Sequence, residues 1–147
     1  MIQLGERLWI GDSDDERHAD LDEVGVGAVL NVAQDLHGVR GWMNGVEYAQ
    51  VGLIDGPGNP PSAYYAAVAA LGTLVRRWRT LVVCHTGSRA LAVALMYLNV
   101  HPRRGWDDLL ALVRERVDGE LPVPHEAHRA AFDKLNWRVL VSALEAE

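Results

Sequence analysis

The stretch TLVVCHTGSRALAVAL, residues 80–95, decides which fold and which chemistry this chain can support. Its apolar run LVVC is typical of a short buried strand, and the run that begins at Ala90 is typical of a buried helix. Gly87 lets the polar loop between them bend tightly, and Arg89 is expected just before the helix. Such a loop brings main-chain N–H groups and the positive end of a helix dipole to one point. The stretch therefore predicts an anion site.

Cys84, the only cysteine of the chain, ends the expected strand. The field at a helix start favours the thiolate over the thiol, and the thiolate is the nucleophilic form. Free cysteines are more often buried structural residues, and Arg89 could instead form a surface ion pair. A cation at a helix start is unfavourable unless it binds an anion. The combination in register therefore favours a reactive cysteine that faces an anion.

Length, charge and composition exclude several classes of protein. With 147 residues the chain is about one domain long, so residues 1–147 are treated as one unit. The net charge of -6 argues against general nucleic-acid binding, which needs a phosphate-neutralising face. No apolar run is long enough to span a bilayer, and residues 1–11 do not resemble a secretory signal. One cysteine cannot form an internal disulfide, so we expect a cytoplasmic protein with no membrane partner.

Outside the central stretch, the pattern of apolar and turn residues predicts alternating strands and helices. Expected strands cover residues 3–10, 27–33, 47–53 and 81–84. A first helix is expected to start at Asp12 or Ser13, to continue through Leu21 and Val24, and to stop at Gly25 and Gly27. A second helix is expected at residues 63–78, with Ser62 as its N-cap. Further helices are expected at residues 90–100, 107–117, 125–135 and 136–146. Residues 34–45 are predicted to form a surface loop. This order predicts a single α/β domain with a central, mostly parallel sheet flanked by helices.

Four further segments resemble the dual-specificity phosphatases within the cysteine-dependent protein tyrosine phosphatase superfamily. RLWIGD (residues 7–12) and AVLNVA (28–33) resemble core strands of that family, and LIDGPGNPPSAYY (53–65) resembles the loop that carries its general acid. LLALVRERVDGELPVPHEAHRAAFDKL (109–135) is similar to its C-terminal helices. The resemblance covers nearly the whole chain. It implies a metal-independent, cofactor-free phosphatase that acts on a phosphorylated protein or small molecule, with phosphotyrosine or a related aryl phosphate as the favoured substrate.

The resemblance also implies a role for each site residue. Cys84 would attack phosphorus and form a phosphocysteine, Arg89 would grip two phosphoryl oxygens, and Asp55 would protonate the leaving oxygen and then activate water. The loop that binds the phosphate would consist of His85, Thr86, Gly87, Ser88 and Arg89. Asn31 would support this loop from the neighbouring strand.

Asp55 has a competing interpretation, because an aspartate before Gly-Pro is also a common turn residue. Asp35, on the preceding polar loop, is the second candidate for the general acid.

The loop departs from the family pattern in length and in its flanking residues. Only four residues separate Cys84 from Arg89, one fewer than is usual in the family. Val83 stands where the family has a histidine, and Ala90 where it has a hydroxyl residue that helps the thiolate to leave. The pattern Cys-x-x-Gly-x-Arg also resembles the loop of rhodanese-like sulfurtransferases, in which cysteine carries a persulfide. Sulfur transfer by Cys84 and a catalytically weak phosphate-binding module therefore remain as alternatives.

Two further pairs of residues have patterns that could indicate a metal site or a substrate-steering surface. His125 and His128 are three residues apart and would share one face of a helix, but without a third ligand at suitable spacing they do not predict a metal site. Arg103 and Arg104 could steer phosphorylated substrates, although exposed arginines after a helix are the commoner explanation.

Overall fold

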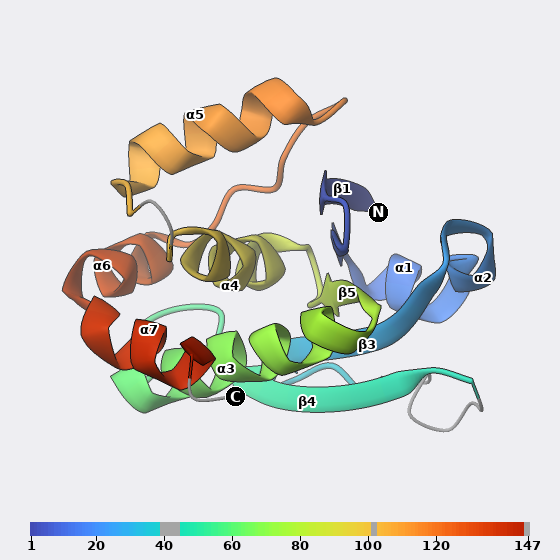
Figure 1. Cartoon of the computed structure of the whole chain (residues 1–147), viewed down its shortest axis with the longest axis horizontal. Helices are drawn as coiled ribbons and strands as arrows, with labels where there is room; N and C mark the ends of the chain where they lie inside the picture. The colour runs from blue at the N-terminus through green and yellow to red at the C-terminus, as the bar shows by residue number, and fades with distance from the viewer. Residues whose placement is uncertain (39–44, 101–102, 146–147) are drawn as a thin grey trace.

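The computed structural model describes residues 1–38, 45–100 and 103–145, which form the alternating strands and helices shown in Figure 1. The described strands are β1 (Ile2–Gly5), β2 (Leu8–Gly11), β3 (Val26–Ala33), β4 (Glu47–Leu53) and β5 (Arg79–Val83). The described helices are α1 (Ser13–His18), α2 (Leu21–Val24), α3 (Pro61–Arg77), α4 (Ser88–Leu98), α5 (Trp106–Arg116), α6 (Glu126–Lys134) and α7 (Trp137–Glu145).

The strands form one sheet in the order β1-β2-β5-β3-β4. Only the β1–β2 pair is antiparallel, and β2, β5, β3 and β4 run parallel to one another. The central strands are apolar on both faces: Val29, Leu30, Leu81 and Val82 are all fully buried. This continuous burial is what a parallel sheet covered on both sides requires. The predicted α/β domain with a central, mostly parallel sheet is confirmed.

Helices α3 and α4 pack directly on the sheet and on each other. Helix α7 lies against α3, while α5 and α6 lie against α4, so the C-terminal helices form an outer layer on that side. Helices α1 and α2 contact β2, β5 and β3 instead, and in Figure 1 they lie at the opposite end of the molecule from α6 and α7. None of the described helices combines the length and apolar character needed to cross a membrane.

The N-terminal region contains two more breaks than the sequence indicates. The single strand expected at residues 3–10 is a hairpin, because the polar pair Glu6 and Arg7 turns the chain and β1 folds back on β2. The helix expected through Leu21 and Val24 is likewise split. Asp12, one of the two predicted cap residues, caps α1 through a capping box, but Asp20 caps a separate helix α2 by accepting from the main-chain N–H of Glu23 at 3.2 Å.

Two predicted boundary residues have other roles. Gly25 ends α2 in the left-handed conformation, but Gly27 lies inside β3, where an added Cβ would come within 2.8 Å of Trp78. Gly27 therefore permits a close approach and does not stop the helix. Ser62 is not the N-cap of α3, because Pro60 occupies that position and Pro61 begins the helix. Proline suits the first turn, since its fixed φ is helical and the missing N–H has no partner there.

Helix α4 begins at Ser88, two residues earlier than predicted, so Arg89 lies in its first turn and not before it. The helix ends at Leu98 with Asn99 as C-cap. Strand 47–53 is confirmed, and the other C-terminal helices agree with prediction to within one or two residues. Part of the predicted 34–45 loop, residues 39–44, and residue 146 of the last predicted helix lie outside the described residues.

Candidate active site

The four parallel strands end at one edge of the sheet, and the candidate residues follow these ends. Cys84 follows β5, Asp35 comes two residues after β3, and Asp55 comes two residues after β4. Because β3 lies between β5 and β4, the loop after β3 is the direct neighbour of the cysteine loop. Crevices at the carboxyl ends of parallel strands are the usual ligand sites of such sheets. The topology thus brings together residues that are far apart in sequence.

The Cys84 loop, residues 84–89, is held largely by main-chain hydrogen bonds. Cys84 is fully buried, and its Sγ accepts from the N–H of Gly87 at 3.1 Å and of Ala90 at 3.5 Å. The loop is anchored to the N-terminal region, because the N–H of Ser13 donates to the carbonyl of His85 at 3.1 Å. Main-chain N–H donors and the start of α4 therefore converge on the sulfur atom.

Gly87 is required at its position for two independent reasons. Its φ of +87° lies in the left-handed region, and it serves as the N-cap of α4. An added Cβ would also meet Pro122 at 3.3 Å and the carbonyl of Gly11 at 3.7 Å. The tight turn of the loop therefore depends on glycine here.

Arg89 is almost entirely buried, and one nitrogen of its guanidinium group, Nη1, makes two hydrogen bonds. Nη1 donates to the carbonyl of Leu53 at 2.8 Å and to Oδ1 of Asp35 at 2.9 Å. Within residues 1–38, 45–100 and 103–145, the buried Nε has no hydrogen-bond partner. The contacts through Nη1 fix the plane of the group, and Nε belongs to the edge that a bidentate contact with an oxyanion would use.

Asp35 contacts two basic side chains of the cysteine loop, Arg89 and His85. Besides its bond with Arg89, its Oδ1 lies 3.6 Å from Nε2 of His85, and its carbonyl lies 3.0 Å from the same nitrogen. Desolvation raises the pKa of Asp35, but the hydrogen bond and charge of Arg89, with smaller help from His85, outweigh it and leave the pKa below its ordinary value. Asp35 is thus kept ionised, which makes it a poor proton donor.

Asp55 lies beside the cysteine loop on the turn that precedes α3. Its Oδ1 is 3.5 Å from Oγ of Ser88, which is in turn 3.2 Å from Oγ1 of Thr86. The carboxylate is partly exposed, with 41% of its side-chain area accessible. A side chain that both touches the loop and reaches solvent can exchange a proton with a bound substrate or with water.

His128, named above only as one of a possible metal-binding pair, contacts the carboxylate of Asp55, which the sequence did not indicate. It is fully buried on α6, with Nε2 at 3.2 Å from Oδ1 of Asp55 and Nδ1 at 2.8 Å from the hydroxyl of Tyr64. Burial lowers the pKa of His128, although the hydrogen bond and charge of Asp55 partly oppose this. The sequence signal was a histidine within the apolar pattern of a helix, but its partner is 73 residues away. The described residues contain no cluster of three or more potential metal ligands.

Asn31 supports a different loop from the one expected. Its side-chain amide donates to the carbonyl of Leu36 at 2.8 Å and to the hydroxyl of Tyr48 at 3.0 Å, and its Oδ1 accepts from the N–H of Ala33 at 2.9 Å. These bonds hold the loop after β3 in place and therefore help to position Asp35, which lies on that loop. Among the described residues, the hydrogen bonds of the Asn31 side chain go to Ala33, Leu36 and Tyr48 and not to the Cys84 loop.

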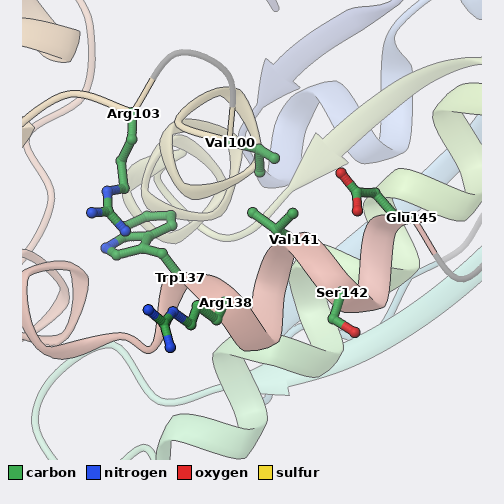
Figure 2. Close-up of a pocket in the computed structure, with 7 residues that line it drawn as sticks. All are labelled: Val100, Arg103, Trp137, Arg138, Val141, Ser142 and Glu145. Carbon is green, nitrogen blue, oxygen red and sulfur yellow. The ribbon is translucent and has the colours of Figure 1, made fainter.

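A cavity of about 520 Å³ lies elsewhere, between the end of α4 and helix α7. Figure 2 shows its lining residues, with Arg103 and Trp137 close together above α7 and Val141 facing Val100. Helix α4 has 11 residues and is therefore roughly 16 Å long, so this cavity is remote from the Cys84 loop at the opposite end. Arg103 is accordingly not positioned to contact a phosphate at Cys84.

Comparison with solved structures identifies the fold. The chain superposes on a mouse putative dual-specificity phosphatase with a TM-score of 0.78 and 24% sequence identity, covering 97% of this chain and 90% of that one. The match to human DUSP28 has a TM-score of 0.77 and 22% identity, with 99% of both chains covered. This chain has the fold of the dual-specificity phosphatases.

A third structure with the dual-specificity phosphatase-like fold was determined with a ligand. Pseudomonas aeruginosa TpbA, in a complex with phosphotyrosine, matches with a TM-score of 0.72 and 15% identity over 99% of this chain and 90% of that one. Neither protein-family models nor curated proteins gave a sequence match. The predicted resemblance to the phosphatases is thus confirmed by structural similarity over nearly the whole chain.

Proposed function

We propose that this protein is a metal-independent cysteine phosphatase that hydrolyses phosphomonoesters, with phosphotyrosine or a related aryl phosphate as its substrate and the cytoplasm as its location. The observation that carries the proposal is the Arg89 guanidinium: it is buried in the Cys84 loop and bound through Nη1, and its Nε has no partner in the part of the chain that the structure describes. A buried cation with an open edge at a helix start has the geometry for a phosphoryl group.

The chemistry needs two displacements at phosphorus. In the first, the Cys84 thiolate forms an S–P bond while the P–O bond to the leaving group breaks, and Asp55 gives its proton to the departing oxygen. In the second, Asp55 takes a proton from water, the water oxygen bonds to phosphorus, and the S–P bond breaks to release phosphate and the thiolate. Arg89 and the loop N–H groups stabilise the charge on the phosphoryl oxygens in both transition states.

Asp55 is preferred over Asp35 as the proton donor because their partners differ. Asp35 is ion-paired with Arg89, and its lowered pKa opposes protonation. Asp55 faces Ser88 and a histidine whose own lowered pKa keeps it neutral near pH 7. A carboxyl group next to neutral partners can hold a proton more readily than one beside a guanidinium.

The proposed activity is tested by hydrolysis of aryl phosphates with a chelator present. Wild type should turn over, Cys84→Ser should be inactive, and Asp55→Asn should lower the rate by about two to four orders of magnitude. Trapping of a stoichiometric phosphocysteine would identify the nucleophile. Equal activity of all three proteins would refute the assignment.

A phosphate-binding module with weak turnover is a second candidate. It is favoured by Asp35, whose negative charge occupies Nη1 of Arg89, and by Ala90 at the family's hydroxyl position. Phosphopeptide binding without hydrolysis would support it.

Sulfur transfer remains the third candidate, on the basis of the four-residue spacing between Cys84 and Arg89. A persulfide on Cys84 after thiosulfate treatment, detected by mass analysis, would support it.

A further inference from the structure

The carboxylate of Asp55 is connected to two helices by a chain of buried side chains. His128 on α6 contacts Oδ1 of Asp55 through Nε2 and the hydroxyl of Tyr64 on α3 through Nδ1. The hydroxyl of Tyr64 is also 3.3 Å from Nδ2 of Asn59. Tyr64 and His128 are only 2% and 0% exposed, so their polar atoms must find partners inside the protein.

The direction of each hydrogen bond in this chain follows from the one before it. Oδ1 of Asn59 accepts from the N–H of Ile54 at 2.8 Å, so the amide group facing Tyr64 is the NH2 donor. The Tyr64 oxygen therefore accepts from Asn59, and its own O–H has Nδ1 of His128 as the available acceptor. Desolvation raises the pKa of Tyr64, although the Asn59 bond opposes this, so the phenol keeps its proton.

A neutral imidazole that accepts at Nδ1 carries its hydrogen on Nε2. Nε2–H then donates to Oδ1 of Asp55, the same oxygen that Ser88 contacts. Oδ1 is consequently engaged from two sides, and a proton on Asp55 is directed to Oδ2. We propose that His128 is a positioning residue for the general acid: it holds Oδ1 and so presents the proton on Oδ2 to the leaving oxygen. This inference rests on the proposed phosphatase function.

The groups that face His128 come from four parts of the fold. Asp55 approaches from the loop after β4, Tyr64 from α3, Arg89 from α4, and His125 from the start of α6 itself. His125 and Arg89 both lower the pKa of His128, in the same direction as its burial. Burial, His125 and Arg89 therefore favour the neutral form of His128, and Asp55 opposes them.

The test compares substrates whose leaving groups differ in their need for a proton. Nitrophenyl phosphate has a good leaving group, whereas phenyl phosphate releases a phenol with a pKa of about 10, as tyrosine does. His128→Phe keeps the ring volume without the donor, and His128→Gln keeps an N–H donor near the position of Nε2. We expect His128→Phe to lower kcat/KM for phenyl phosphate about tenfold more than for nitrophenyl phosphate, and His128→Gln to restore much of that difference.

A double variant, His128→Phe with Asp55→Asn, distinguishes a positioning role of His128 from a general disruption of the site. If His128 acts through Asp55, adding His128→Phe to Asp55→Asn should cause less than a twofold further loss, whereas independent effects would multiply. An equal loss on both substrates, or multiplicative losses in the double variant, would overturn the positioning role while leaving the phosphatase function standing. No Cys84-dependent turnover by the wild type would overturn the proposed function and the positioning role together.

A measurement on the unmodified protein covers the case in which His128→Phe does not fold. Nitrogen chemical shifts of the His128 ring should show the hydrogen on Nε2, and Tyr64→Phe should weaken this preference by removing the donor to Nδ1. A wild-type ring that carries its hydrogen on Nδ1 would overturn the inference whatever the kinetics show.

Discussion

The loops after β3 and β4 are similar in construction, but the aspartate on each loop has a different partner. Each follows a parallel strand and is held by an asparagine that bonds to the main chain at several points: Asn31, within β3, holds the first loop, and Asn59, within the second loop, holds that one. Each then offers an aspartate to a buried basic side chain: Asp35 meets Arg89, and Asp55 meets His128. Comparison of these two aspartates therefore shows how the charge of the partner side chain affects a carboxylate.

The partner's charge decides what each carboxylate can do. Arg89 is always cationic, so its contact keeps Asp35 ionised and gives it a structural role. Burial lowers the pKa of His128, so Asp55 faces a neutral imidazole near pH 7 and not a fixed cation. Similar local construction thus produces one fixed charge and one candidate acid.

The largest expected effect is the difference between Asp55→Asn and Asp35→Asn in turnover. Asp55→Asn should reduce kcat for phenyl phosphate by about two to four orders of magnitude, because it removes the proposed proton donor. Asp35→Asn should change kcat by less than about tenfold, since its contact with Arg89 can be made by an amide oxygen. Steady-state kinetics on one substrate checks both, and similar losses would end the distinction between the loops.

The two asparagines should separate stability from activity. Asn31 is fully buried, so Asn31→Ala leaves the carbonyl of Leu36 and the N–H of Ala33 short of partners and should cost about 1–3 kcal/mol in unfolding free energy. Asn59 is only partly buried, so Asn59→Ala should cost less, about 1 kcal/mol. Because Asn59 holds the Asp55 loop, its loss should nevertheless lower kcat more. Denaturant unfolding and kinetics on both variants measure this, and the reverse order in kcat would contradict it.

Asp35 should also oppose anion binding. Its carboxylate contacts the guanidinium that is proposed to hold the phosphoryl group, so Asp35→Asn removes a negative charge next to the bound anion. We expect inorganic phosphate to inhibit Asp35→Asn at a concentration several-fold lower, which corresponds to less than about 1.4 kcal/mol. Unchanged or weaker inhibition would mean that Asp35 mainly orients Arg89.

The smallest expected effects concern stability as a function of pH. The pKa of His128 is lowered in the fold, so the unfolded chain binds its proton first and stability should fall as pH drops below about 6.5. This part should be absent from His128→Gln. The pKa of Asp35 is also lowered, so its contribution is present above about pH 3.9 and is lost only at lower pH. Urea unfolding at pH 7.5, 5.5 and 3.5 separates the two ranges.

The cysteine loop could be predicted because its information is local. The buried strand, Gly87 and the apolar helix are consecutive, and their order alone indicates a strand, a tight turn and a helix start. Local signals were less complete where two interpretations competed. Asp20 starts a second helix and Pro60 displaces Ser62 as a cap, and both residues also fit an ordinary turn.

The sequence by itself determined an α/β chain with a cysteine, a glycine and an arginine in register around a candidate anion site. These features depend on neighbours along the chain, where spacing is enough to set geometry. Only the tertiary structure decided which aspartate meets the arginine and which meets a neutral histidine. Those contacts join residues 54 and 73 positions apart, and they follow from the placing of β3 between β5 and β4 and from the packing of α6 on α4. A pairing made across the fold leaves no spacing pattern in the sequence.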